Sequence, residues 1–526
     1  MATTARTAES SSEPENTQIR VTFDDAISAA KFGRFNYWLI LISAVILTAA
    51  LLESIGISYV IAVLDCDLQL TTKDKGVLSA VTYVGIIISS HMWGFLADTQ
   101  GRRKVMIPTL LMAATSTIIS SFMPNFWSIT FFRLLTGIFV SGSSATIYAY
   151  LGEFHSRQNG SRAIMAASFI FSVHLLLIPV VAFLTINREW SLETPFFGVV
   201  YCPWRLFVAI CSIPSLVGAL ALSRMPESPK FVSDQGDEKT ALAIIHRIHR
   251  INSRSKEKPL AFQHILPDSE SGAQKLRLSK GQGIRGLSKL IWEQTAPLFR
   301  QQFLRKTAFV CVIQFGTFYI AHGTFMFFPT ILDALVRSKD AGVQNSTICE
   351  VYYSSTSNSS TVTQECSAML ETQTYGWGFV LEIVYAIGFI IIGAIISRIK
   401  RSLILAFVCI CCGAAAIALV QTNNAALNIA LYMLTVMCGY NVSVVSSITV
   451  DFFPTHLRAM AVCISMMFGR LGCVVGANVT GALLDHNCEL TFGLSGSILL
   501  ACAVFSLFMP KIAKQLRPTN DITEQS

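Results

Sequence analysis

Twelve long apolar runs constrain this chain more than any other feature. They lie at 35–64, 76–97, 105–123, 126–150, 163–186, 206–223, 307–332, 375–397, 402–420, 425–450, 459–484 and 491–509. A bilayer core of about 30 Å is crossed by roughly 20 helical residues, and only a helix satisfies its own backbone groups in a continuous apolar run. The sequence therefore predicts an all-α membrane protein with twelve transmembrane helices.

The positive charges indicate the orientation of these helices. The two termini and the even-numbered loops hold 32 of the 40 Lys and Arg residues. Because cytoplasmic loops carry the excess of cations, this bias predicts that both termini are cytoplasmic. The net charge of +8 then reflects topology, and we expect no nucleic-acid partner.

A polar stretch divides the runs into two sets of six. Residues 224–306 form a linker between a bundle at 35–223 and a second bundle at 307–509. This order predicts two six-helix pseudo-repeats related by an axis along the membrane normal. Residues 1–34 form a cytoplasmic tail with a short amphipathic segment, and residues 510–526 form a second cytoplasmic tail.

The linker contains one helical pattern. Leu242, Ile245, Ile248 and Ile251 recur every three residues among basic side chains. The pattern predicts an amphipathic helix, and two placements remain open. The helix lies on the inner membrane surface, or it packs underneath the bundle.

The longest outer loop, 333–374, carries two N-glycosylation sequons, at Asn345 and Asn358. We expect both to be modified, since the loop is predicted to face away from the cytoplasm. Cys349 and Cys366 flank the second sequon, and compartments on that side of the membrane favour disulfides. We predict that these two cysteines pair. The alternatives are free thiols or pairing with Cys66, Cys202 or Cys488.

Five short motifs occupy the loops and helix ends. They are Gly94 to Lys104 after the second run, Arg133 to Gly137 in the fourth, Glu153 to Arg162 after the fourth, Pro226 to Lys230 after the sixth, and Asp451 to Arg458 after the tenth. In this order they resemble the signatures of the major facilitator superfamily. Asp24 to Phe35, Met225 to Pro229 and the glycosylatable loop are similar to the synaptic vesicle glycoprotein 2 group and related organic ion transporters.

The first motif suggests a gate. Gly94 is expected to let a neighbouring helix come close, and Gly101 to form the turn. The resemblance implies two rocking halves with cytoplasmic latches, in which Asp98 meets the eleventh helix and a nearby arginine in the outward-open state. An echo of the motif at 393–401 has Ser397 at the acid position, which predicts a weaker latch there. The other latch residues are Arg102, Glu153, Arg162, Glu227, Asp451 and Arg458.

Charged side chains inside the runs indicate function, because each is costly in lipid unless it is paired or hydrated. Glu53 in the first run and Arg470 in the eleventh are candidates to line a central cavity. Glu53 would bind a cation or a proton, and Arg470 an anionic group. A purely structural buried pair is the alternative. The remaining substrate or coupling candidates are Arg133, His174, Gln314, Tyr319, Tyr440 and Asn441.

No pattern favours an enzyme, a cofactor or a metal site. The chain lacks a phosphate-cradling glycine motif and a paired nucleophile and base, and its CxxC at 409–412 lies within an apolar run. We predict a secondary transporter of a small organic solute, organic ions included, that works by alternating access with proton or ion coupling.

The alternative function is a transporter-like protein that binds a regulatory ligand or a protein partner without transport. In either case we expect a monomer in the lipid bilayer of the plasma membrane or of a secretory or synaptic-like vesicle.

Overall fold

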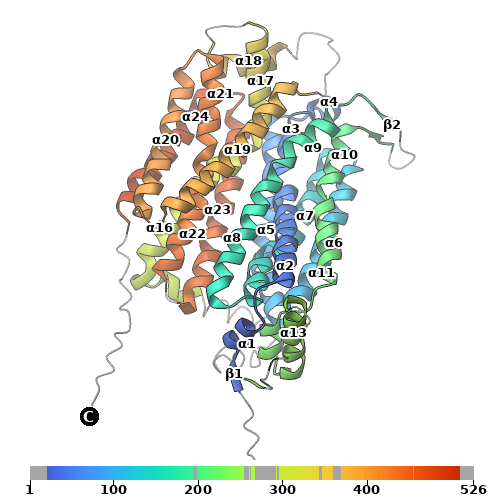
Figure 1. The fold of residues 1–526 in the computed structure, drawn as a ribbon. Helices are drawn as coiled ribbons and strands as arrows, with labels where there is room; N and C mark the ends of the chain where they lie inside the picture. The colour runs from blue at the N-terminus through green and yellow to red at the C-terminus, as the bar shows by residue number, and fades with distance from the viewer. Residues whose placement is uncertain are drawn as a thin grey trace, which may run out of the picture.

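The computed structural model describes residues 20–193, 198–253, 260, 262, 264–266, 292, 295–342, 346–358, 369–396, 398–453 and 455–509. Twelve helical segments in these ranges are long and apolar enough to cross a membrane, as predicted. Figure 1 shows them as one upright bundle, with α18 (Ile348–Asn358) at one end and α13 (Glu238–Asn252) at the other. We call these the loop end and the linker end.

The first six spans form the N-half. They are α2 (Arg34–Ile55) with α3 (Ile57–Ile61), α5 (Thr72–Gln100), α6 (Arg102–Ser121), α7 (Phe126–Glu153), α8 (Arg157–Leu175) with α9 (Leu177–Ile186), and α10 (Pro203–Cys211) with α11 (Ile213–Ser223). At the loop end they are joined by α4 (Asp65–Leu68) and by an antiparallel pair, β2 (Leu192–Glu193) and β3 (Val200–Tyr201).

The last six spans form the C-half. They are α16 (Gln301–Phe318) continued by η2 (Tyr319–Gly323), η3 (Thr324–Phe327) and α17 (Phe328–Asp340), then α19 (Thr372–Ile395), α20 (Arg401–Gln421), α21 (Ala425–Val436) with η4 (Met437–Gly439) and α22 (Tyr440–Phe452), α23 (Thr455–Leu483) and α24 (Cys488–Leu507). A short 3-10 turn, η1 (Ala296–Phe299), precedes them.

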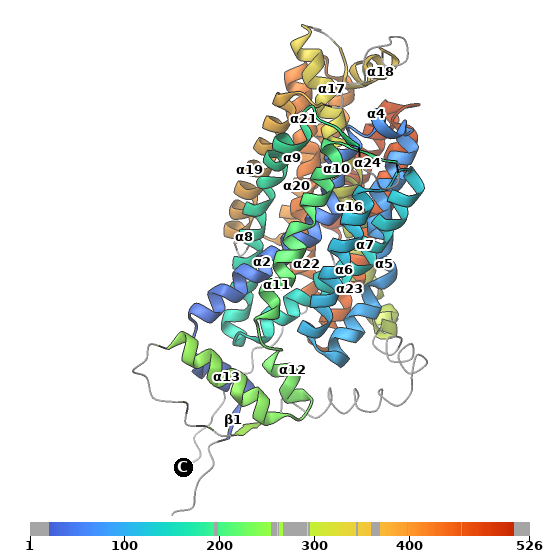
Figure 2. The same ribbon diagram turned by 90° about the vertical axis from the view of Figure 1, so that its right-hand side faces the viewer.

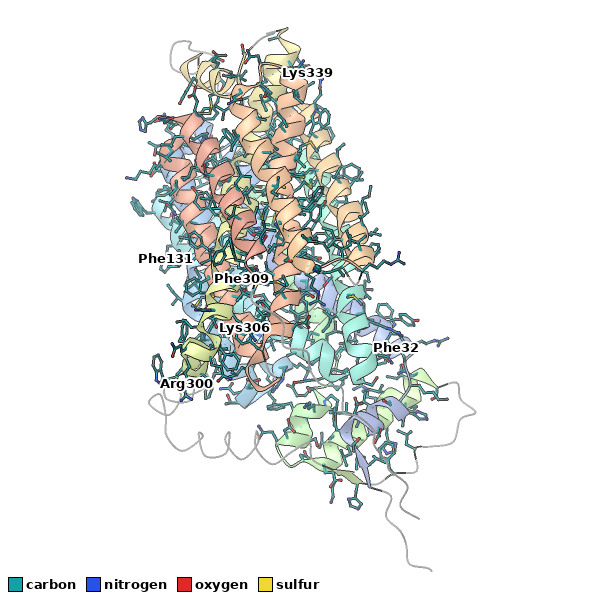
Figure 3. All side chains as sticks on the ribbon, turned by 90° about the vertical axis from the view of Figure 1, so that its left-hand side faces the viewer. Phe32, Phe131, Arg300, Lys306, Phe309 and Lys339 are labelled. Atoms are coloured by element: carbon teal, nitrogen blue, oxygen red, sulfur yellow. A yellow bond between two sulfur atoms is a disulfide. The ribbon has the colours of Figure 1, made fainter. Side chains whose placement is uncertain are left out.

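The seventh span is longer than its apolar run and is not a regular α-helix. Figure 3 places Arg300 at the linker end and Lys339 at the loop end, so the span crosses the whole bundle. Its middle changes to π geometry in η2 and to 3-10 geometry in η3. Within a membrane such irregular backbone is tolerated where protein buries it or where it faces a cavity. All of η2 except His322 is buried, and protein packing therefore supports this break.

The buried apolar side chains show how the halves meet. The largest cluster contains residues of both halves, and it includes Tyr59 of α3 and Tyr375 of α19, whose rings stack at 6.0 Å. Two smaller clusters each belong to one half, one containing Phe35 and Tyr150 and the other Phe309. The halves therefore share an apolar core toward the loop end and are packed separately toward the linker end.

The lateral surface of the bundle is apolar. Phe131 is 55% exposed and projects from the side of the bundle (Figure 3). Ile88, Met165 and Phe407 are likewise exposed on other spans. Apolar side chains around the whole bundle are what a lipid-facing surface requires, which agrees with the membrane class.

A small unit covers the linker end of the N-half (Figure 2). It consists of α1 (Phe23–Ala29), α12 (Pro229–Asp234), α13 and a parallel pair, β1 (Arg20–Thr22) and β4 (His264–Leu266). Asn252 at the end of α13 ties this unit to the start of α2. Its Oδ1 accepts the Phe35 N–H at 2.9 Å, and its Nδ2 donates to the Lys31 carbonyl at 2.7 Å.

The apolar face of α13 differs from the predicted one. Ala241, Ile244, Ile245 and Ile248 are buried, whereas Ile251 is exposed. An α-helix repeats every 3.6 residues, so residues spaced alternately by three and four share one face. Residues spaced strictly by three move gradually around the helix and leave that face. This face packs against α1 and β4, so the helix lies underneath the bundle.

The structure contradicts the predicted disulfide between Cys349 and Cys366. Cys349 in α18 is bonded to Cys488 at the start of α24, with Cα atoms 5.5 Å apart. Tertiary contacts bring them together, because the backbone N–H of Cys488 donates to Tyr353 Oη at 2.8 Å. Cys366 and Asn345 lie outside the described residues. Asn358 is the last residue of α18, and its side chain is likewise outside them.

Replacing Cys488 by Ser should free the Cys349 thiol and lower the stability by about 2–4 kcal/mol, because the bond closes a long loop. Non-reducing peptide mapping and thermal unfolding with and without reductant measure both effects. Cys366→Ser is the matched control and should leave the Cys349–Cys488 peptide intact. A linked peptide that joins Cys349 to Cys366 would contradict the structure.

Candidate functional site

Glu53 and Arg133 form an ion pair inside the N-half. Glu53 is fully buried, and its Oε2 lies 3.8 Å from Arg133 Nη1. Thr117 donates to Oε2 at 2.5 Å and Ser215 to Oε1 at 3.3 Å. Arg133 Nη2 also donates to the backbone carbonyl of Glu53. The expectation that Glu53 lines a cavity is therefore wrong for this conformation, because four helices of one half enclose it.

Arg470 lies on α23 where this helix faces α5 of the N-half. Its Nη1 donates to Ser90 Oγ at 2.9 Å, and Ser90 Oγ lies 3.0 Å from Ser141 Oγ. Among the described residues Arg470 has no carboxylate partner, and its side chain is half-buried. The structure thus places an unpaired cation at the boundary between the halves.

Glu382, in the middle of α19, is a charged residue that was not among the candidates predicted from the sequence. This half-buried carboxylate makes no hydrogen bond or ion pair with another described residue. Tyrosines lie near it on α19, because the Tyr59 hydroxyl lies against Gly378 one turn before it and Tyr440 donates to the Val384 carbonyl two residues after it. The signal was available, because Glu382 is the single charged residue in the apolar run 375–397.

Three of the substrate candidates are buried within the C-half. Gln314 and Asn441 are fully buried. Gln314 Nε2 donates to Met466 Sδ at 3.4 Å, and Asn441 Nδ2 donates to Cys409 Sγ at 3.1 Å. Tyr319 is 3% exposed in the π turn of the seventh span. These side chains pack helices against one another in this conformation.

The last two candidates occupy helix contacts. Tyr440 donates its hydroxyl to the Val384 carbonyl at 2.8 Å, which joins α22 to α19 beside Glu382. His174 Nδ1 lies 2.9 Å from Thr48 Oγ1 and joins α8 to α2. Tyr440 therefore belongs to the surroundings of Glu382, whereas His174 belongs to the N-half.

The first motif forms a charged cluster at the linker end of the N-half. Arg102 Nη2 lies 3.0 Å from both Asp98 Oδ1 and Glu153 Oε1. The guanidinium also lies 5.1 Å from the ring centroid of Phe231 in α12. One arginine therefore bridges the ends of α5 and α7 and rests against the linker.

Glu227 caps the N-terminus of α6, which begins at Arg102 within the motif. Its carboxylate accepts the backbone N–H groups of Arg103 at 3.0 Å and Lys104 at 3.3 Å, where the N-terminus of α6 favours negative charge. Gly101 has φ +114°, and a Cβ there would lie 2.6 Å from Glu227 Oε2. This turn therefore requires glycine for both its conformation and its space.

The C-half has a related pair. Arg401 at the start of α20 pairs with Asp451 at the end of α22, in places that match Arg102 and Glu153 in the N-half. Arg162 is exposed, and no ion pair between described residues involves it. The Arg458 side chain and Ser397 lie outside the described residues. The pairs of Arg102 and of Arg401 each stay within one half, so neither forms a latch between the halves in this conformation.

Gly94 does not have its expected role here. A Cβ at Gly94 would meet no described atom within 4 Å, whereas one at Gly76 would lie 2.8 Å from the Ala477 carbonyl oxygen. The backbones of α5 and α23 therefore meet near the loop end. Asp98 pairs with Arg102, and no ion pair or hydrogen bond between described residues joins it to α23.

Arg133→Leu should destabilise the protein by about 3–5 kcal/mol, because it leaves the Glu53 carboxylate buried without a cation. Adding Glu53→Gln should recover part of this loss. Thermal unfolding in detergent compares the variants, with Arg162→Leu as the control at an exposed arginine. The assignment fails if Arg133→Leu is as stable as Arg162→Leu.

Comparisons with known proteins agree with this arrangement. The chain is 25% identical over 336 residues to synaptic vesicle glycoprotein 2A of Bos taurus. This alignment covers 60% of this chain and 44% of that protein. It is 26% identical over 329 residues to synaptic vesicle glycoprotein 2B of Rattus norvegicus, covering 60% and 48%. The chain thus aligns with less than half the length of these relatives.

Solved structures show the same fold. The xylose transporter XylE from E. coli, in a partially occluded inward open conformation, superposes with a TM-score of 0.61 at 14% identity, over 91% of this chain and 100% of that one. A bacterial homolog to the human lysosomal transporter Spinster, inward-facing and unoccupied, gives 0.54 at 12% identity, over 90% and 95%. The family model described as Major Facilitator Superfamily matches residues 35–477 and 351–524. The chain therefore belongs to the major facilitator superfamily.

Proposed function

We propose that the protein is a secondary transporter that carries a small organic ion across a membrane by alternating access. One observation carries this proposal: the two halves share a core toward the loop end and have separate cores toward the linker end. Two bundles joined in this way can rock against each other around a site between them. Membership of the superfamily supports the same function.

The orientation that we propose places the linker end and both termini in the cytoplasm. The bias of Lys and Arg toward the linker, the even-numbered loops and the termini supports it. The bond between Cys349 and Cys488 at the loop end supports it as well, because disulfides persist in oxidising compartments. The loop end would then face the exterior or the lumen of a secretory vesicle, and this conformation would admit solute from the cytoplasm.

Unpaired charge at the boundary favours an ionic solute. Arg470 has a serine as its hydrogen-bond partner and lies between α23 and α5. A cation at this depth is costly unless water or an anion accompanies it. We propose that the anionic group of the solute meets Arg470 when the halves close around it.

Uptake into proteoliposomes tests the function with a panel of organic anions, cations, zwitterions and sugars. Arg470→Gln should lower the uptake of solutes that carry a carboxylate by about tenfold or more, since a hydrogen bond to a charged group contributes roughly 1.5–3 kcal/mol. Arg398→Gln, at an exposed arginine of the linker end, is the matched control. A folded protein that moves none of these solutes would rule out transport of these classes and favour a ligand-binding role.

Asp98→Asn should shift the protein toward the conformation described here. We propose that Asp98 contacts α23 when the linker end closes, and coupling energies of this kind change an equilibrium roughly fivefold or more. Labelling of Cys463, which is exposed on α23, measures the shift. Ser397→Ala is the control at the equivalent position of the C-half, and equal effects of the two variants would contradict the asymmetric latch.

A further inference from the structure

Two carboxylates within the spans, those of Glu53 and Glu382, have very different surroundings. Glu53 has a cation and two hydroxyl donors around its oxygens. Glu382 has no hydrogen-bond or ion-pair partner among the described residues, and it is half-buried. A carboxylate inside a membrane costs several kcal/mol unless something accompanies it. Since no described residue neutralises it, the Glu382 carboxylate requires a proton, water or a cationic ligand as its partner.

Glu382 faces the boundary between the halves and not the lipid. Gly378, Glu382, Tyr385 and Phe389 share one side of α19, because they are spaced by four, three and four residues. Gly378 lies directly against the Tyr59 hydroxyl of the N-half. The opposite side of the helix carries exposed isoleucines that suit lipid, namely Ile383, Ile387, Ile390 and Ile391. Figure 1 shows α19 running beside α8 and α9 of the N-half.

Aromatic rings lie on the side of α19 that carries this carboxylate. The Tyr440 ring lies 5.1 Å from the rings of both Tyr385 and Phe389, measured between centroids. Tyr59 contributes a third tyrosine from the N-half, because its hydroxyl lies against Gly378, one helical turn from Glu382. This side of α19 and its neighbours therefore combine one carboxylate with several aromatic rings.

Backbone contacts hold two of these tyrosines in place. The hydroxyl of Tyr385 donates to the Val436 carbonyl, and that of Tyr440 donates to the Val384 carbonyl. A Cβ on Gly439 would lie 2.8 Å from Tyr385 Oη, so this packing depends on glycine. Since both hydroxyl protons are engaged elsewhere, they are not donated to Glu382.

We propose that Glu382 binds the ammonium group of an organic cation, with Tyr59, Tyr385 and Tyr440 around its alkyl groups. An anion supplies the charge that an ammonium needs, and aromatic faces attract quaternary ammonium groups. A metal ion fits less well, since it requires several ligands, and the described residues contain no group of three His, Cys, Asp or Glu side chains that could hold one.

This assignment deepens the proposed function and rests on it for transport, although binding can be measured alone. Arg470 supplies a positive charge at the same boundary. A solute that met both charges would carry an anionic group as well as an ammonium group. Because Tyr59 belongs to the N-half and Glu382 to the C-half, a bound ammonium contacts both halves.

Binding of choline to the full chain in detergent tests the site, with the uncharged carbon analogue of choline as the paired probe. The wild type should prefer choline, and Glu382→Gln should weaken choline binding about tenfold or more, because it removes a charged contact. Tyr440→Phe keeps the ring and should bind choline nearly as well, whereas Tyr440→Leu should bind it about threefold or more weakly. Glu489→Gln, at an exposed carboxylate of the loop end, is the control and should bind normally.

Equal binding of choline and its carbon analogue would overturn the assignment, and so would unchanged choline binding by Glu382→Gln. If that variant is misfolded by thermal unfolding, Glu382→Asp replaces it, and a retained preference for choline supports the site. Choline binding that depends on Glu382 without uptake of any solute would keep the site and reject transport. Normal uptake of ammonium compounds by Glu382→Gln would keep transport and reject the site.

Discussion

A charge inside a bilayer must be neutralised or hydrated, and the arrangement of this molecule depends on that requirement. In the N-half Glu53 and Arg133 neutralise each other, and hydroxyl groups occupy the remaining carboxylate positions. In the C-half Glu382 and Arg470 have no ionic partner among the described residues. The N-half thus contains a buried ion pair, whereas the two unpaired charges of the C-half lie at the boundary between the halves. The charges of the N-half are therefore satisfied within that half, and we propose that the solute satisfies those of the C-half.

The rocking that we propose for the two halves requires contacts that differ between the two ends of the bundle. Toward the loop end, the stacked rings of Tyr59 and Tyr375 and the close backbones at Gly76 join the halves. Toward the linker end, Arg102 and Arg401 pair within their own halves. Apolar contacts are tight but non-directional. The Arg401–Asp451 pair is partly exposed, and surface ion pairs contribute little singly, whereas the Arg102–Glu153 pair is largely buried. Separation at one end can therefore be balanced by new pairing at the other.

The sequence was sufficient for the fold because each span repeats one simple signal, a run of apolar residues of membrane length. It was insufficient where tertiary structure chooses the partner. Cys349 bonds to Cys488, since α18 folds over the start of α24, and no spacing along the chain encodes that contact. Glu53 was expected at a cavity, but four helices enclose it. The position of a residue along a helix gives its depth in the membrane and not the neighbour that its side chain faces. Glu382 was not predicted although it is the single charged residue in its apolar run, because the hydrophobic character of the run as a whole hides one acid.

The disulfide has a consequence for how the loop end moves. Cys349 and Cys488 both belong to the C-half, so the bond fastens α18 to the bundle from which it projects. A cross-link between the halves would resist their rotation, whereas this one joins α18 to α24 within one half. Any glycan on Asn358 would then travel with the C-half as it turns. In the orientation that we propose, a fluorescent label on α18 would report the tilt of that half from outside the membrane.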